Sequence, residues 1–220
     1  MPVLWHVVHR LQHAKNIDDI VVATTGLKED DVIASFCLKS NIHYFRGDSE
    51  DVLSRYYVAA KKSKAEIIIR ITSDCPMIDP EIVDKIIACF EANQSPGKKI
   101  DYCSNTIERT YPRGFDTEVF SFKALSAAYH KAKDYFEREH VTPYIYQNPG
   151  QFSIKSFRSP KNYSHLRLTL DTSEDYQLLK KIYDQLYSRT KLFLFKDIKK
   201  LSKKEPELFE INKNVVQKGR

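Results

Sequence analysis

Strand-like and helix-like segments alternate along residues 1–93, and this alternation constrains the fold more than any other feature. Short apolar runs, which are typical of buried strands, occupy residues 18–25, 42–47 and 66–74. Segments with apolar residues three or four positions apart, which are typical of helices, occupy residues 2–14, 29–41, 49–64 and 79–93. Because parallel strands need a helical crossover between them, this order predicts a mostly parallel sheet with helices on both faces.

The pattern becomes less regular after the loop at residues 95–99. Further strands are predicted at residues 101–105, 116–122, 152–157 and 165–171, and further helices at residues 122–133, 138–148 and 172–188. Pro143 must kink or begin the second of these helices. We interpret residues 1–220 as one domain, with a β-rich insertion at 100–165 and a basic, solvated C-terminal helix and tail at 189–220.

Three helix starts carry local signals. Ser49 suits the N-cap of the helix at 49–64, and Pro80 suits a first-turn position of the next helix. Thr172 or Ser173 suits the N-cap of the last strongly periodic helix.

Composition describes an ordinary globular chain. Of its 220 residues, 42% are hydrophobic and 29% charged, which is enough to bury a core. No segment has the length of a membrane span or the pattern of a signal peptide, and the four cysteines lack C-x-x-C spacing. The net charge of +6 is not accompanied by a nucleic-acid-binding motif. We therefore expect a cytoplasmic protein with reduced thiols and neither nucleic acid nor a membrane as partner.

Two aspartates stand where apolar runs end. Asp74 follows "EIIIRIT" and Asp171 follows "LRLTL". In an open parallel sheet, ligands bind at the carboxyl ends of the strands, so both acids would project from the same edge. Two carboxylates there would repel each other without a cation, and Mg²⁺ bridges carboxylates to phosphate oxygens. The alternative for each aspartate alone is an ordinary helix N-cap.

Six segments in order carry a resemblance to a known family: "VVATT", "FRGDSEDVLSRYYVAA", "RITSDCPMIDPEIVD", "YPRGFDTEVFSFKAL", "EREHVTPYIY" and "RLTLDTSEDYQL". Together they resemble the cytidylyltransferases, in particular the branch for spore-coat polysaccharide biosynthesis. The resemblance covers residues 2–188. It implies a Rossmann-like nucleotidyltransferase fold, a three-layer α/β sandwich.

The resemblance also implies a reaction, in which CTP and an acidic sugar give a CMP-sugar and pyrophosphate. The family's metal-binding acids fall on Asp74, in the D-x-P motif, and on Asp171, which opens D-T-x-E-D. We therefore expect Mg²⁺ as cofactor, CTP and an acidic sugar as substrates, and a homodimer with residues 100–165 forming the region for sugar binding and dimerisation.

Further site residues are expected from the same motifs. The candidates for nucleotide binding are Thr24, Asp51, Arg55, Arg70 and Ser73. The candidates for sugar binding are Arg113, Asp116, Glu118, Arg138, Glu139 and His140. Arginine suits a sugar carboxylate because its planar fork binds two oxygens at once. Structural alternatives remain open: a strand role for Thr24, a surface pair between Asp51 and Arg55, and a structural hydrogen bond for His140.

Family members open with a strand and a basic, glycine-containing loop resembling "ARxxSxRLPGK", whereas this chain begins with the helix at residues 2–14. We expect these 220 residues to fold, to bind CTP weakly with little turnover, and to associate through an open strand edge. Two other functions remain open. One is a non-catalytic sugar-nucleotide-binding or dimerisation protein. The other is a nucleotide-sugar glycosyltransferase, although "SDCP" lacks the second acid of a D-x-D motif.

Overall fold

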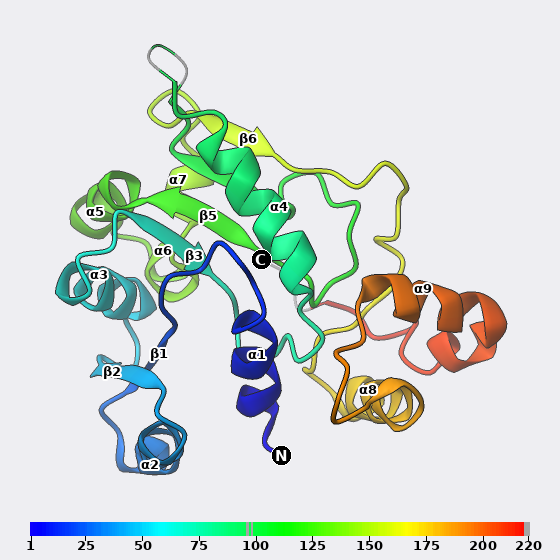
Figure 1. Ribbon diagram of the computed structural model, residues 1–220. Coiled ribbons are helices and arrows are strands. Elements are labelled where there is room, and N and C mark those ends of the chain that lie inside the picture. The colour runs from blue at the N-terminus through cyan, green and yellow to red at the C-terminus, as the bar shows by residue number, and fades with distance from the viewer. Residues whose placement is uncertain (96, 98, 218–220) are drawn as a thin grey trace.

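The computed structural model, which describes residues 1–95, 97 and 99–217, contains two separate sheets, a larger one near the centre and a smaller one to its side (Figure 1). Their strands are β1 (Val21–Thr25), β2 (His43–Gly47), β3 (Ile67–Arg70), β4 (Tyr102–Ser104), β5 (Glu118–Ser121) and β6 (Ile154–Ser156). β1 and β2 form one sheet, and the other has the order β3-β5-β4-β6. Among the described strands, β1 therefore pairs only with β2, and β3 only with β5.

The mixed α/β fold is confirmed, but its strand pairing is less parallel than the alternation predicts. β1–β2 and β4–β6 are parallel, whereas β3–β5 and β4–β5 are antiparallel. No helix of the structure lies between β4 and β5 in the described chain. The chain therefore turns back into the neighbouring position without the crossover that a parallel neighbour would need.

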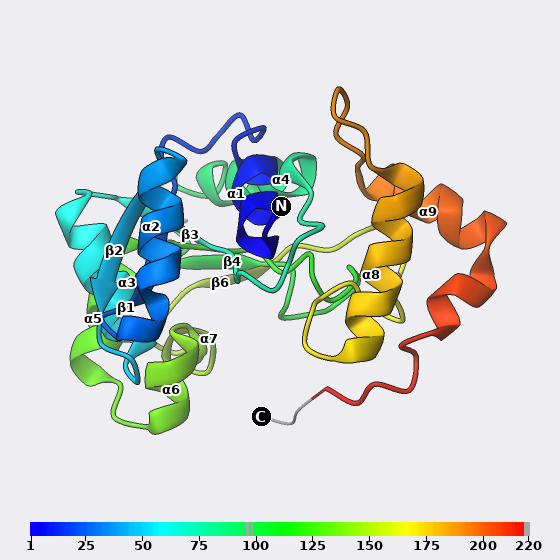
Figure 2. The same cartoon turned by 90° about the horizontal axis from the view of Figure 1, so that it is seen from below.

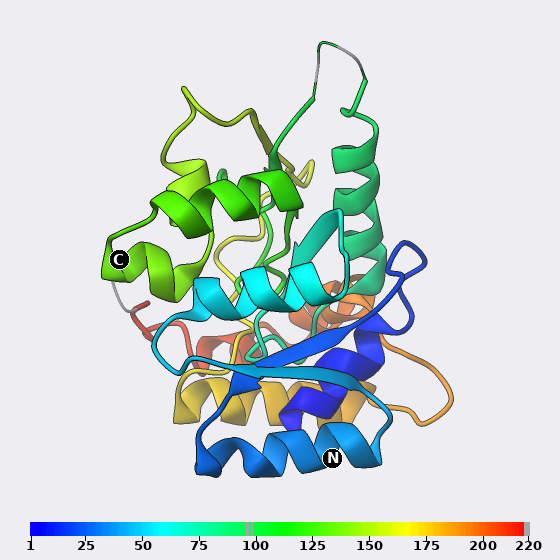
Figure 3. The same ribbon diagram turned by 90° about the vertical axis from the view of Figure 1, so that its left-hand side faces the viewer.

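Helices cover both faces of the four-stranded sheet. The α-helices are α1 (Val3–Leu11), α2 (Asp31–Lys39), α3 (Val52–Lys62), α4 (Pro80–Glu91), α5 (Phe122–Lys131), α6 (Tyr135–His140), α7 (Pro143–Tyr146), α8 (Ser173–Leu186) and α9 (Phe195–Lys204). Two 3₁₀ turns, η1 (Lys28–Asp30) and η2 (Pro206–Glu210), complete the described elements. α4 lies on one face of the sheet and α3 and α5 lie on the other, as Figure 3 shows.

Alternation along the strands divides the core between these faces. In β5, Val119 belongs to the hydrophobic cluster on the α4 side, while Phe120 belongs to the cluster under α3 and α5. In β4, Cys103 and Tyr102 divide in the same way. Because successive strand residues point to opposite faces, one sheet supplies two cores and three layers result.

Helix α1 links the two sheets through its two apolar sides. Val7 packs into the α4-side cluster, whereas Val8 packs with Cys37 of α2 and Ile42 near β2. Figure 2 shows α1 between α2 and α8. The ring centroids of His6 in α1 and Tyr183 in α8 lie 4.7 Å apart. The helix predicted at residues 2–14 is thus confirmed and lies between several layers.

Two of the three predicted helix starts are confirmed. Pro80 occupies the first turn of α4, and the Thr172 side chain accepts a hydrogen bond from the Asp175 N–H at the start of α8. Ser49 as the N-cap is wrong. Asp48 accepts the N–H groups of Glu50 and Asp51 in a tight turn, so α3 begins later and Asp51 caps it.

The predicted strand at residues 165–171 is wrong as a regular strand, although the segment is extended. It forms one isolated bridge, between Arg113 and Arg167. Its main-chain groups form hydrogen bonds with two different loops. Leu166 and Leu168 pair with the main chain of Arg113, and the N–H of Leu170 donates to the main-chain oxygen of Asp74. Within the described residues no single strand runs beside it, so a continuous ladder does not form.

Two predictions about the later regions need correction. Residues 100–165 are not a β-rich insertion, because they contain α5, α6 and α7, and β4, β5 and β6 belong to the main sheet. The C-terminal region is not simply solvated either, since Phe195, Ile198 and Leu201 of α9 are buried. Most lysines of this amphipathic helix are exposed, but Lys199 lies over the rings of Tyr163 and Phe195. Within the described chain, no helix is long and apolar enough to cross a membrane.

Candidate active site

The turn after β3 places Asp74 against the segment that leads to α8. The main-chain oxygen of Asp74 accepts the N–H of Leu170 at 2.9 Å. Its Oδ2 accepts the hydroxyl of Thr169 at 3.0 Å. These contacts fix Asp74 beside a segment that reaches Asp171 only two residues after Thr169, although the two acids are far apart in sequence.

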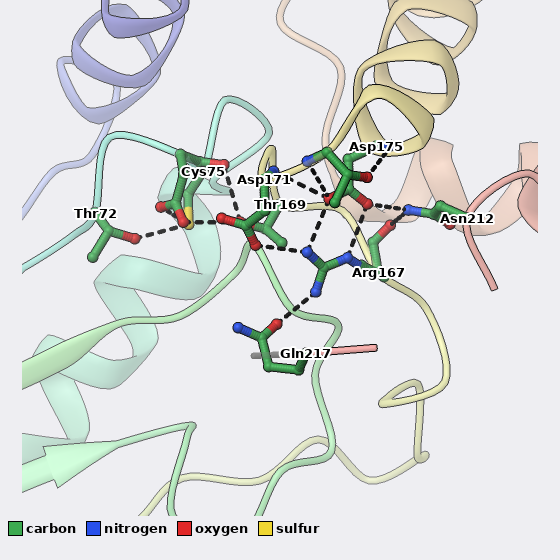
Figure 4. Close-up of polar contacts among 10 residues, drawn as sticks. Thr72, Cys75, Arg167, Thr169, Asp171, Asp175, Asn212 and Gln217 are labelled. Carbon is green, nitrogen blue, oxygen red and sulfur yellow. Dashed lines mark hydrogen bonds and ion pairs between the residues drawn. The ribbon is translucent and has the colours of Figure 1, made fainter. Parts of the chain in front are cut away.

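Asp171 lies where this segment turns into α8 (Figure 4). Its side chain is 40% exposed, and its Oδ2 accepts a hydrogen bond from Arg167 Nη2 at 2.6 Å. Among the described contacts, Oδ1 of Asp171 receives no hydrogen bond. The carboxylate is thus oriented by an arginine on one side and open to solvent on the other.

The oxygen donors of Asp74 and Asp171 suit Mg²⁺, which commonly binds to one or two carboxylates and completes its shell with water and phosphate oxygens. The residues that the structure describes contain no group of three or more His, Cys, Asp or Glu side chains able to hold a metal. A single Mg²⁺ shared by the two acids and a nucleotide stays a prediction.

Behind Asp171 lies a buried ion pair between Arg167 and Asp175. Arg167 donates from Nε and Nη2 to the two carboxylate oxygens of Asp175, both at 2.9 Å. The Asp175 side chain is fully buried. Burial alone would raise the pKa of Asp175, but hydrogen bonds from Arg167, Asn212 and the Asp171 N–H lower that pKa below its ordinary value. The acid therefore stays ionised and keeps Arg167 in place.

A second charged pair joins Arg109 to Asp116. Arg109 binds both oxygens of Asp116, at 2.5 and 2.8 Å. Burial opposes the charge of Arg109, but Asp116, Cys75 and Glu118 raise its pKa above the ordinary value. Burial raises the pKa of the neighbouring Cys75 thiol, and the negative charges of Asp74 and Asp116 raise it further.

Glu118 and Arg70 form a buried pair at the ends of β5 and β3. The Glu118 carboxylate also accepts the hydroxyls of Tyr102, at 2.6 Å, and Thr142, at 2.5 Å. Among the described residues, Nε of Arg70 is buried without a partner. Glu118 is thus committed to a structural network, while Arg70 retains a donor.

A fourth charged set joins α3 to α6. Asp51 caps α3 through the N–H of Ser54 and forms an ion pair with Arg138. The surface pair between Asp51 and Arg55 is therefore wrong, because the guanidinium of Arg55 bonds to the main-chain oxygens of Asp48 and Ser49. Arg138 is held further by the main-chain oxygen of Tyr129 at 2.8 Å.

The remaining candidates are scattered. Thr24 is buried in β1, and its hydroxyl donates to Asp30 at 3.0 Å, which fits the structural alternative. Ser73 is exposed in the turn before Asp74. Glu139 and His140 lie on α6 and are half exposed. His140 Nε2 lies 3.7 Å from Glu139 Oε2. No contact tests a binding role for any of these residues, so those roles stay predictions.

Sequence reasoning missed Arg109, Arg167, Thr169 and Asn212 as members of the site. Arg167 carried a signal, because an arginine inside the apolar run "LRLTL" must find a partner when it is buried. Asp175 carried another, since it stands three residues after Thr172 in the pattern of a capping box. Asn212 lies 37 residues beyond Asp175 and carried none.

Comparison with known proteins finds relatives that span most of the chain. A family model described as cytidylyltransferase matches residues 1–215. An uncharacterized protein of Methanocaldococcus jannaschii is 37% identical over 99% of this chain and 86% of its own length. The spore coat polysaccharide biosynthesis protein SpsF of Bacillus subtilis is 31% identical over 83% of this chain and 76% of its own length.

A solved structure is also similar over the whole chain. It is a cytidylyltransferase from Leptospira borgpetersenii, 32% identical, with a TM-score of 0.89 over 100% of this chain and 89% of that one. The Rossmann-like nucleotidyltransferase fold expected from the motifs is therefore confirmed. With a family model that spans nearly all residues and a solved relative of this similarity, the chain belongs to the cytidylyltransferase family.

Proposed function

We propose that this protein transfers the CMP group of CTP to an acidic sugar for surface polysaccharide synthesis, with Mg²⁺ held by Asp74 and Asp171. The observation that carries the proposal is the attachment of Asp74 to Thr169 and Leu170, which brings two carboxylates from distant segments to one region. The name of the Bacillus subtilis relative, a spore coat polysaccharide biosynthesis protein, supports the polysaccharide context.

In this reaction a sugar hydroxyl attacks the α-phosphorus of CTP, a P–O bond to the sugar forms, the bond to the pyrophosphate leaving group breaks, and the hydroxyl proton is released to water. Mg²⁺, when bound, supplies positive charge to the phosphate oxygens. The protein fixes its two acids in advance: Thr169 holds Asp74, and Arg167 holds Asp171. Preorganised groups of this kind cost no reorganisation when charge develops, so they contribute to the rate.

The proposal is tested by pyrophosphate release from a panel of nucleoside triphosphates and acidic sugars, with and without Mg²⁺. We expect release, at the low rate expected above for these 220 residues, to require CTP, an acidic sugar and Mg²⁺ together. Release with a different triphosphate would reassign the base. Transfer of sugar from a preformed nucleotide-sugar, without pyrophosphate release, would instead support the glycosyltransferase alternative.

The sugar side of the proposed site is tested by replacing arginine with lysine, which keeps the charge but loses the two-pronged geometry. We expect Arg113→Lys to raise the KM for the sugar about tenfold, since one charge-assisted hydrogen bond is worth roughly 1.5 kcal/mol or more. The KM for CTP should not change. Arg138→Lys should mainly lower the melting temperature, because Arg138 is tied to Asp51 and Tyr129. An unchanged sugar KM in both variants would show that the sugar binds elsewhere.

A further inference from the structure

A segment near the C-terminus contacts Arg167 and Asp175, the buried ion pair next to Asp171. The chain leaves α9, passes through η2, and brings Asn212 beside the start of α8, as the close-up in Figure 4 shows. Asn212 is buried, with only 3% of its surface exposed. A buried amide must use its hydrogen-bonding groups, so its partners reveal what the segment holds.

The side-chain amide of Asn212 bridges two residues of the network. Its Nδ2 donates to Oδ1 of Asp175 at 2.7 Å and to the main-chain oxygen of Arg167 at 3.0 Å. Gln217, five residues later, accepts a hydrogen bond from Arg167 Nη1 at 2.5 Å. The segment therefore contacts both members of the buried ion pair.

Asp175 connects Asn212 to Asp171 through hydrogen bonds of its carboxylate. Besides Arg167 and Asn212, its carboxylate accepts the main-chain N–H of Asp171 at 3.1 Å and that of Thr172 at 3.2 Å. The position of Asp175 thus sets the backbone at Asp171. In parallel, Arg167 sets the Asp171 carboxylate through the hydrogen bond at 2.6 Å. Backbone and side chain of Asp171 are both fixed by groups that Asn212 touches.

We propose that Asn212 is a positioning residue for the transfer reaction, which orients the Asp171 carboxylate through Asp175 and Arg167. This inference rests on the proposed role of Asp171 in holding Mg²⁺ with CTP. Asn212 contacts neither the acid itself nor Asp74 within the described hydrogen bonds, and acts from a segment outside the sequence motifs. Removing a group that orients a metal ligand without contacting the metal commonly lowers the metal affinity 10–100-fold.

The test replaces Asn212 by leucine, which has a similar volume but no donor. We expect Asn212→Leu to weaken the binding of Mn²⁺ in the presence of CTP about tenfold, measured by electron paramagnetic resonance. We also expect faster hydrogen exchange at the main-chain amides of Asp171 and Thr172, measured without metal or nucleotide. Asn212→Ser, which cannot span both acceptors, should show the same two effects if the leucine variant does not fold.

The matched control is Leu208→Ala in η2. Leu208 is buried in the same segment but belongs to the hydrophobic core rather than to the charged network. It should lower the melting temperature while leaving Mn²⁺ affinity and exchange at Asp171 unchanged. A merely structural role for Asn212 would make both Asn212 variants behave like this control, and the inference would then be overturned.

The two readouts separate this inference from the proposed function. If the unmodified protein binds neither Mn²⁺ nor CTP, the proposed function is overturned. The role of Asn212 in catalysis is then overturned as well. The exchange comparison would still decide whether Asn212 holds Asp171. Faster exchange together with unchanged Mn²⁺ affinity would show that Asn212 fixes the backbone without serving the metal site, and would overturn the inference.

Discussion

Asp74→Asn and Asp171→Asn are each expected to lower Mg²⁺-dependent pyrophosphate release roughly a hundredfold or more while the protein stays folded. A carboxylate that holds a metal against transferring phosphates contributes several kcal/mol to the transition state, and about 1.4 kcal/mol corresponds to a factor of ten. Asparagine keeps an oxygen that accepts from Thr169 at position 74, or from Arg167 at position 171. The free energy of unfolding should therefore change by only about 1 kcal/mol.

The matched control for these variants is Asp184→Asn. Asp184 is exposed on α8, where it forms an ion pair with Lys180 at 2.7 Å. Exposed pairs of this kind contribute little, so both turnover and stability should stay close to those of the unmodified protein. Turnover that survives in Asp74→Asn and Asp171→Asn at the level of this control would remove both acids from the metal site.

Local signals predicted most elements of the fold correctly. The apolar periodicity found α1, α2, α3, α4 and α8. It also found the six strands that the structure describes. These predictions depend on residues within about one turn or one strand of each other, and such spacing is read directly from the chain. Helix starts were less certain, since Asp48 and its turn decided between Ser49 and Asp51.

Pairing of distant segments was much less predictable. Apolar alternation fixes which face of β5 is buried but not the direction of its neighbour, so the antiparallel β3–β5 pair was missed. The extended run before Asp171 reads as a strand because of its apolar residues. It pairs instead with the loops at Asp74 and Arg113, which sequence spacing does not reveal.

Within the site, the acids were accessible to sequence reasoning but their supports were not. Asp74 and Asp171 stand at the ends of apolar runs, where a charge is conspicuous. Thr169, which fixes Asp74, is an ordinary residue of such a run. Asn212 acts across 37 positions from Asp175, and its burial depends on how the segment after α9 packs. Only the folded chain identifies groups of this second kind.

Gly114→Ala is expected to be the most destabilising single substitution near the site. Gly114 has a φ of +93°, where an L side chain costs about 1–2 kcal/mol. A Cβ there would lie 2.3 Å from the main-chain oxygen of Leu168 and 2.7 Å from the nitrogen of Thr169. Both are backbone atoms and have no side-chain rotamer that would relieve the clash. We expect a total loss of at least about 3 kcal/mol in the free energy of unfolding.

The substitution should also separate the two acids, which links this effect on stability to function. The segment that would be displaced carries Thr169, which holds Asp74, and leads directly to Asp171. Gly97→Ala is the matched control, because Gly97 has a similar φ of +82° but, chain neighbours aside, no atom of the described residues lies within 4 Å of a Cβ built there. Urea unfolding gives the loss of stability for each variant. Both variants contain the backbone strain, so the difference between the two losses measures the clash with Leu168 and Thr169. Equal losses of stability would mean that the approach of Gly114 to Leu168 contributes nothing.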